Sequence, residues 1–323
     1  MGAAHACAYR RVAIAAWAAL SAAGDAHATW QAICEQRRCL ALDPEWGWVG
    51  RCAAGDQEEL ALAVCRRLPR PQAPLAFGMA TSKGMLAQHA AAAGPPWLAA
   101  WPGAASARLA ARLQLGLHLP VCCVAACSTA LATLLAGADA LERGQAAQAL
   151  VGAAEASLTP LILAGFRSAG VLCGATLPQA FAAPTGFAPA EGAAAFLLAE
   201  RGPWRLLAGV RLGDAEHETH CLDPLSLGCA LEALWDLAPR PELIVCHATG
   251  TAHGDAYEGA ALARGPWAAV PRLCAKPWIG HTLGASGGVE LAAALQAPCQ
   301  RLWKLSLGFG GHIVALAVER MLR

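Results

Sequence analysis

Residues 117–141 read LHLPVCCVAACSTALATLLAGADAL, and this stretch contains the change of pattern that decides the fold. Residues 117–124 are apolar and partly β-branched, which is typical of a strand, whereas residues 128–141 are rich in alanine and leucine, as helices are. Cys127 stands between the two. A thiol at a helix start faces unpaired backbone N–H groups and the positive end of the helix dipole, and both lower its pKa. We therefore expect Cys127 to be a nucleophile, the alternative being a buried cysteine that packs as a small hydrophobic residue.

The composition is that of a globular protein with a large core. Of the 323 residues, 56% are hydrophobic and 15% are charged. The formal net charge of +1 gives no electrostatic reason to expect nucleic acid or an anionic membrane as a partner. The fourteen cysteines lie mostly in apolar runs, so we expect reduced, buried thiols and a cytoplasmic location.

Strand-like and helix-like segments alternate along the chain, which predicts an α/β fold with a break at residues 201–203. At the N-terminus, Arg10 and Arg11 precede an apolar segment with the outline of a signal peptide. We favour a first core strand at residues 12–17, because removing it would delete an element that the fold needs. No apolar run reaches the length of a membrane span.

Three later segments place histidine or phenylalanine among glycines and other small residues, which let the backbone approach a ligand closely. They are CHATGTAHGD at residues 246–255, KPWIGHTLGASGG at residues 276–288 and SLGFGG at residues 306–311. A lone histidine is usually structural. Two histidines in such turns, together with a cysteine at a helix start, predict a functional site formed by Cys127, His247 and His281.

These segments make the chain resemble a β-ketoacyl synthase, a condensing enzyme of the thiolase-like superfamily, in the branch with a Cys-His-His triad. The matches follow the family's order along the chain, and Lys276 precedes His281 by the family's five residues. The remaining matched segments are residues 12–24, 75–84, 126–129, 149–156 and 191–194. The resemblance implies a five-layer α-β-α-β-α fold made of two similar halves. Residues 1–202 would carry Cys127, and residues 203–323 both histidines and the Gly-Phe-Gly-Gly gate.

The resemblance also implies a reaction, the decarboxylative Claisen condensation of an acyl-enzyme with malonyl-acyl carrier protein. Cys127 would hold the acyl chain, with its own backbone N–H and that of Phe309 as the oxyanion hole. His247 and His281, both neutral, would donate hydrogen bonds to the enolate oxygen. Lys276 would orient the His281 loop, and Glu258 would balance its charge.

Further residues are expected to contact the substrates or to support the site. By resemblance, Phe309 is a gate between the acyl and malonyl sides. The substrates would be carried on the phosphopantetheine of an acyl carrier protein, and no other cofactor is implied. The residues expected to contact the pantetheine arm or the substrate are Thr249, Thr251, Gly308 and Gly310.

Residues 214–221, DAEHETHC, allow two interpretations. They fall one residue short of a zinc-protease His-Glu-x-x-His pattern, because Cys221 occupies the last position, so we expect no metal site. They also resemble the family's Asp-x-x-His-x-Thr stretch, which lines the malonyl side of the pocket. Asp214 and His217 are therefore expected to support the site.

The chain departs from the family in being unusually short, with losses before Cys127 and between His281 and Phe309. This keeps a second class of function open, a chain-length-factor-like partner subunit with little activity of its own. Such partners typically lack the nucleophilic cysteine, which is present here. A third and weaker alternative is a thiolase or an acyltransferase that uses the same cysteine, but residues 308–311 lack the second cysteine of thiolases. An initiating synthase usually has Asn where His281 stands, so elongation is favoured.

The family also implies assembly through a strand of the first half, here residues 117–124. These residues carry no aspartate, glutamate, lysine or arginine, as expected for a strand buried on both faces. An unpaired edge of this kind invites aggregation. We expect a homodimer or a heterodimer with another ketosynthase-like subunit, the alternative being a central strand already flanked within the monomer.

Overall fold

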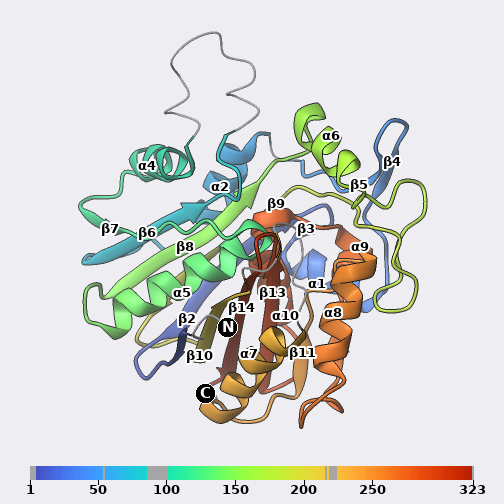
Figure 1. The fold of residues 1–323 in the computed structure, drawn as a ribbon. Coiled ribbons are helices and arrows are strands. Elements are labelled where there is room, and N and C mark those ends of the chain that lie inside the picture. Colours follow the sequence, from blue (N-terminus) through green and yellow to red (C-terminus); the bar gives the residue numbers. More distant parts are fainter. Residues whose placement is uncertain (1–4, 54, 86–100, 215–216, 218–223, 322–323) are drawn as a thin grey trace.

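The structure is a computed structural model that describes residues 5–53, 55–85, 101–214, 217 and 224–321 (Figure 1). Most of its strands join one 12-stranded mixed sheet. Five of them come from the first part of the chain and lie in the order β7 (His118–Pro120), β6 (Leu75–Ala80), β8 (Gln148–Glu155), β9 (Gly192–Ala199) and β2 (Ala13–Ser21). Five come from the second part, in the order β12 (Arg272–Leu273), β11 (Leu243–Val245), β13 (Arg301–Gly308), β14 (His312–Arg320) and β10 (Trp204–Gly213).

The two groups of strands repeat one topology. In each, the first three strands are parallel and the last two are antiparallel to their neighbours. The groups meet where β10 pairs with β2 over Trp204–Ile14 and Arg205–Ala13. Two short strands extend the sheet, β1 (His5–Ala8) beside β10 and β3 (Gly24–Asp25) beside β2, while β4 (Ala41–Asp43) and β5 (Gly47–Val49) form a separate hairpin. This repetition of strand order is the twofold similarity expected of the fold.

Helices divide the strands into layers. The central helices α5 (Thr129–Glu142) and α10 (Ser286–Ala294) contact each other and strands of both groups. The helices α2 (Gln57–Arg66) and α4 (Pro102–Arg112) cover the first group on its other face, and α7 (Pro224–Leu237) with α8 (Ala252–Leu262) covers the second (Figure 1). The result is the expected five-layer α-β-α-β-α arrangement. The other helices of the described residues are α1 (Ala26–Cys34), α6 (Pro160–Ser168), α9 (Lys276–Ile279), and the 3-10 turns η2 (Ala126–Ser128) and η3 (Leu283–Ala285).

Alternation along the strands separates the hydrophobic core into layers. On β8, Val151 packs into the central layer and Leu150 into the layer below α2 and α4. On β13, Leu302 faces the central layer while Trp303 and Leu305 pack toward α7 and α8. Successive side chains of a strand point to opposite faces, so one strand feeds two cores. Among the described residues, no helix combines the length and apolar character needed to cross a membrane.

The strand expected over residues 117–124 is shorter and more exposed than its sequence indicates. Only β7 is a strand, and it is the edge of the sheet, paired with β6 alone. Leu117 is 97% exposed, Val124 50% and Leu119 38%. The expectation that both faces are buried is therefore wrong for the single chain, and so is the alternative of a central strand. By contrast, the N-terminal segment that resembled a signal peptide is a core strand here, β2.

Candidate active site

Cys127 lies in the turn between the β7 segment and α5. Ala126 before it has a φ of +45°, in the left-handed region that non-glycine residues rarely adopt, so the turn is tight and strained. The Thr129 hydroxyl closes the turn by donating to Ala126 O and accepting from Ala125 N–H. The Ser306 hydroxyl on β13 donates to Cys127 O at 3.1 Å. The cysteine is thus fixed by its own turn and by β13, with its side chain at the start of a 14-residue helix.

His247 follows β11 in a loop that a buried carboxylate organises. Glu258, on α8, accepts hydrogen bonds from the backbone N–H groups of His247 and Ala248, each at 2.6 Å. Thr251 caps the N-terminus of α8 by accepting from Gly254 N–H. Glu258 therefore acts on the loop backbone, which holds His247 in place at the end of β11.

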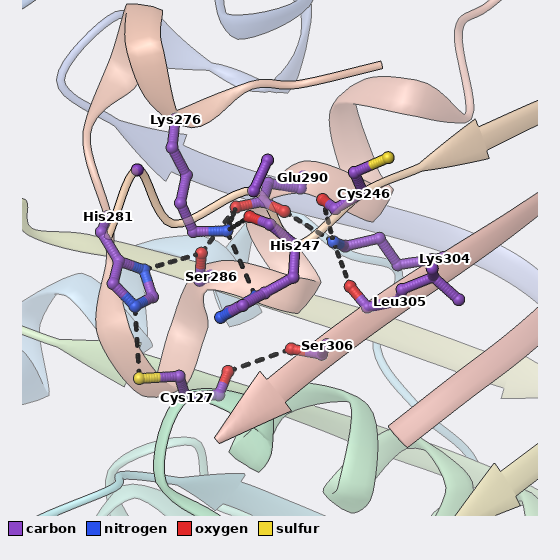
Figure 2. Close-up of polar contacts among 12 residues, drawn as sticks. Cys127, Cys246, His247, Lys276, His281, Ser286, Glu290, Lys304, Leu305 and Ser306 are labelled. Carbon is purple, nitrogen blue, oxygen red and sulfur yellow. Dashed lines mark hydrogen bonds and ion pairs between the residues drawn. The ribbon is translucent and has the colours of Figure 1, made fainter. Parts of the chain in front are cut away.

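His281 is held by strand-like pairing with the first part of the chain. Its N–H donates to Ala188 O, and its carbonyl accepts from Ala190 N–H. Gly280 before it has a φ of +78°, and a Cβ there would lie 2.7 Å from the Ala190 Cβ, so glycine is required for the close approach. The His281 Nε2 lies 3.2 Å from Cys127 Sγ (Figure 2). The His247 and His281 rings meet edge to face, with 5.5 Å between the ring centroids. The structure therefore brings the three residues predicted to form the triad together.

Behind the histidines lies a buried cluster of two lysines around one glutamate (Figure 2). Lys276 Nζ is 2.7 Å from Glu290 Oε1 and also contacts His247 at Nδ1 and at the backbone carbonyl. Lys304 Nζ is 2.6 Å from Glu290 Oε2 and donates to the carbonyls of Cys246 and Leu305. The expectation that Glu258 balances Lys276 is corrected here, because the direct partner is Glu290 and the Glu258 oxygens bind backbone N–H groups.

The electrostatics of the site keep both imidazoles neutral. Burial lowers the pKa of His247 and of His281 well below the usual value, and the charges of Lys276 and Lys304 lower both further. Burial alone would raise the pKa of Glu290, but the two lysines hold it below its usual value, so this carboxylate is ionised.

The thiol of Cys127 differs from the sequence expectation. Burial raises its pKa to about 11, although the charges of Lys83 and Lys276 act in the opposite direction. The expected lowering at a helix start is therefore wrong for the resting site, because desolvation of a thiolate outweighs the favourable charges. A thiol with this pKa is protonated near neutral pH, so it must lose its proton before it can act as a nucleophile.

A cavity of about 520 Å³ opens over these groups. Cys127, His247 and His281 line it, and so do four of the other residues predicted from the sequence, namely Thr249, Thr251, Gly308 and Phe309. Gly310 is exposed at the turn between β13 and β14, and it does not line the cavity. The cavity is therefore built from both parts of the chain.

Asp214 and His217 do not line this cavity. Asp214 is buried at the end of β10, and its N–H donates to Gly311 O beside the Phe309 turn. His217 is half-buried, and the rest of the predicted stretch, residues 215–216 and 218–221, lies outside the described residues. Within the described part of the chain, no group of three or more His, Cys, Asp or Glu side chains is placed to hold a metal ion.

Sequence reasoning missed three residues that the structure adds to the site, Ser286, Glu290 and Lys304. Glu290 is four residues after Ser286, which places both on one face of α10. Lys304 interrupts the apolar run of β13, and a charged residue within a buried strand was the one signal that could have found it.

Solved structures share this fold across almost the whole chain. The ishigamide ketosynthase/chain length factor matches with a TM-score of 0.85 at 19% identity, covering 98% of this chain and 100% of that chain. A ketosynthase in complex with its chain length factor from Xenorhabdus doucetiae matches with a TM-score of 0.83 at 20% identity, covering 97% of this chain and 98% of that chain. A type II polyketide ketosynthase in complex with its acyl-carrier protein matches with a TM-score of 0.82 at 18% identity, covering 97% of this chain and 100% of that chain. These matches define the class of the fold as the thiolase-like fold of ketosynthases.

Sequence comparison gives the family. The β-ketoacyl synthase N-terminal domain model matches residues 73–202, and the C-terminal domain model matches residues 235–309, together more than half of the chain. The chain belongs to the β-ketoacyl synthase family. It is 32% identical over 187 residues to the chloroplastic 3-oxoacyl-[acyl-carrier-protein] synthase I of Arabidopsis thaliana, a match that covers 50% of this chain and 39% of that protein. The matched part therefore spans about two-fifths of this curated relative.

Proposed function

We propose that this chain is an elongating β-ketoacyl-[acyl-carrier-protein] synthase. It transfers an acyl chain onto Cys127 and condenses it with malonyl-acyl carrier protein by a decarboxylative Claisen reaction, giving a 3-ketoacyl product in fatty acid, polyketide or polyene-type synthesis. The observation that carries the proposal is the 3.2 Å contact between Cys127 Sγ and His281 Nε2, in a cavity also lined by His247. Membership of the family supports the reaction class.

Cys127 is the nucleophile of the first half-reaction, and the backbone N–H groups of Cys127 and Phe309 form the oxyanion hole. The packing of Gly308 supports this assignment. A Cβ at Gly308 would lie 2.5 Å from Ala125 O and 3.2 Å from Cys127 N, so the end of β13 lies directly against the nucleophile turn. That approach supports the choice of the next residue, Phe309, as the second oxyanion donor, and Phe309, which lines the cavity, serves as the gate.

His247 stabilises the enolate of the second half-reaction. The ammonium of Lys276 has only hydrogen-bond donors, so its 3.3 Å contact with His247 Nδ1 requires that nitrogen to accept. A neutral His247 then carries its proton on Nε2, which is free to donate to the enolate oxygen without protonating the carbon that attacks. Lys276 is thus a positioning residue for His247.

The substrates arrive on the phosphopantetheine arm of an acyl carrier protein, and we assign no other cofactor. Thr249 and Thr251, 3.3 Å apart through their hydroxyls at the cavity wall, are placed to contact the arm. One similar solved structure is a ketosynthase in complex with its acyl-carrier protein. We assign the reaction to the cytoplasm, because the cysteines that the structure describes carry free thiols, which persist in a reducing compartment.

A chain-length-factor-like partner subunit is the second candidate function. Two of the similar structures contain a ketosynthase together with a chain length factor, which favours this candidate at the level of fold. The retained Cys127 and the intact contacts of both histidines favour the enzyme.

We propose a dimer formed through β7, with a second copy or with another ketosynthase-like subunit, and two halves at residues 1–202 and 203–323. The exposed edge of β7, with Leu117 97% exposed beside it, supports this surface. Light scattering of the purified chain tests it, with a dimer expected. An active monomer at micromolar concentration refutes the dimer, and solubility gained only by co-expression with a second synthase identifies the heterodimer.

Intact-protein mass spectrometry after mixing with an acyl-carrier thioester tests the function itself. We expect one acyl adduct, which peptide mapping places on Cys127. Cys127→Ala should remove the adduct and lower condensation by more than about 10⁴-fold, as loss of a covalent nucleophile does, with thermal unfolding unchanged. An unmodified wild-type chain supports the partner-subunit function instead, and condensation by Cys127→Ala ends the catalytic proposal.

A further inference from the structure

Ser286 joins the catalytic histidine to the buried charge cluster. At the first residue of α10, its Oγ is 3.2 Å from His281 Nδ1 and 2.6 Å from Glu290 Oε1 (Figure 2). The serine is completely buried, as is Glu290 to within 1%. The contacts run in one line from Cys127 through His281 and Ser286 to Glu290.

The direction of the hydrogen bonds in this line is fixed by proton counting. Glu290 is ionised between Lys276 and Lys304, and a carboxylate only accepts. The single hydroxyl proton of Ser286 is therefore directed to Glu290. Its oxygen has only lone pairs left for His281 Nδ1, so that nitrogen must carry the proton and donate.

Lys304 keeps Glu290 ionised and thereby fixes the direction of the hydrogen bond from Ser286 to Glu290. It sits on β13, on the face that carries Leu302 and points to the central layer, and its three ammonium protons are used by Glu290 and two carbonyls. With a second lysine on Oε2, Glu290 stays charged even though it is buried. A protonated Glu290 could donate to Ser286 and release the hydroxyl proton, and the lysines prevent that.

We propose that Ser286 is a positioning residue that holds His281 in the Nδ1–H tautomer, so that the bare Nε2 accepts the proton of Cys127. This inference rests on the proposed function and deepens it. His281 then differs from His247, whose contact with Lys276 leaves the proton on Nε2. The sequence assigned both rings the same task of donating to the enolate, and the hydrogen bonds of Ser286 give His281 the opposite one.

The acylation step balances with these groups alone. The Cys127 S–H proton moves to His281 Nε2, and the resulting imidazolium keeps its Nδ1–H on Ser286. A sulfur lone pair forms the new bond to the thioester carbonyl carbon, and the bond from that carbon to the pantetheine sulfur breaks. The departing thiolate takes the proton from Nε2, so His281 is neutral again. The pKa of about 11 at Cys127 makes this acceptor necessary near neutral pH.

Nitrogen-15 NMR of histidine-labelled wild-type protein tests the tautomer directly, because a protonated and a bare imidazole nitrogen resonate far apart. His281→Gln assigns the signals of His281 by their loss. We expect Nδ1 of His281 to carry the proton and Nε2 to be bare. A proton on Nε2 overturns the proposal.

The function of the tautomer is tested by the alkylation rate of Cys127 with iodoacetamide, followed by peptide mapping. Ser286→Ala should slow this rate about three- to tenfold, the effect of losing one hydrogen bond. The matched control is Ser21→Ala, which removes another buried serine hydroxyl, bonded to Thr29 and to the N–H of Ala23, and should leave the rate unchanged. An equal rate in Ser286→Ala and wild type overturns the proposal.

A second readout separates positioning from a general structural effect. Malonyl-thioester decarboxylation is measured in the Cys127→Ala background, where it depends on His247. Adding Ser286→Ala should leave this rate unchanged, and a loss there instead of in alkylation overturns the proposal. None of these measurements needs condensation, so a chain that fails to condense yet shows the tautomer and the Ser286 effect refutes only the proposed function.

Discussion

The loops of His247 and His281 contain the same residue in nearly the same surroundings, yet they prepare it for opposite tasks. Both rings are buried, neutral and 5.5 Å apart. The Nδ1 of His247 faces the ammonium of Lys276, which can only donate, whereas the Nδ1 of His281 faces a serine whose proton is directed to Glu290. The partner of the inner nitrogen therefore decides what the outer nitrogen offers to the substrate.

The difference teaches that one buried carboxylate can set two tautomers at once. Glu290 holds Lys276, which fixes His247, and holds Ser286, which fixes His281. Its own charge is kept by Lys304. The difference between the two histidines can be tested with variants that act on His247, on His281, or on both.

Of the variants that distinguish the two histidines, His281→Ala is expected to change a rate most. We expect acylation of Cys127 by an acyl-carrier thioester to fall about 10²- to 10⁴-fold, the usual contribution of a general base. Decarboxylation of malonyl thioester in the Cys127→Ala background should change little. Mass spectrometry of the acyl adduct measures acylation, and carbon dioxide release measures decarboxylation. A loss confined to decarboxylation would contradict the assignment of His281 as the proton acceptor of Cys127.

His247→Ala should give the reverse pattern. Loss of the Nε2–H donor is expected to lower decarboxylation about 10²- to 10³-fold, as removal of an oxyanion donor does. Acylation should be reduced less, because Cys127 and His281 keep their contact. The two rates are measured as for His281→Ala, and equal losses in both rates would show that the rings share one task.

The smallest effects are shifts in pH dependence. The charge of Lys304 lowers the pKa of both histidines, whereas Lys83 lowers that of His281 and is not among the groups that act on His247. Activity needs neutral rings, so it is lost as the pH falls through their pKa values. Lys304→Met raises both values and should move the acid limb of acylation and of decarboxylation to higher pH.

Lys83→Met is the matched control for Lys304→Met. It should move the acid limb of acylation to higher pH while that of decarboxylation stays in place. The pH profiles of the two rates in both variants provide the measurement. An unmoved acid limb in Lys304→Met would contradict the electrostatic account.

Much of the architecture follows from local sequence. The alternation of strand-like and helix-like runs predicts α/β layers. The glycines around His247, His281 and Phe309 predict turns in which the backbone can approach a ligand closely. Residues 117–124 show the limit of this reasoning. Their apolar character indicates a buried strand, but the single chain leaves β7 at the sheet edge with Leu117 exposed. Apolar character alone therefore does not predict whether the rest of the chain covers a strand.

The sequence by itself determined the family and the five-layer fold and indicated Cys127, His247, His281 and Lys276 as candidate site residues, because these depend on residue type and order within short motifs. The tertiary structure alone decided the charge state and the hydrogen-bond directions of the site. Burial of Cys127 raises its pKa, Glu290 replaces Glu258 as the partner of Lys276, and Lys304 reaches Glu290 from a separate strand. These properties depend on desolvation and on distances between atoms far apart in the chain, and local sequence specifies neither.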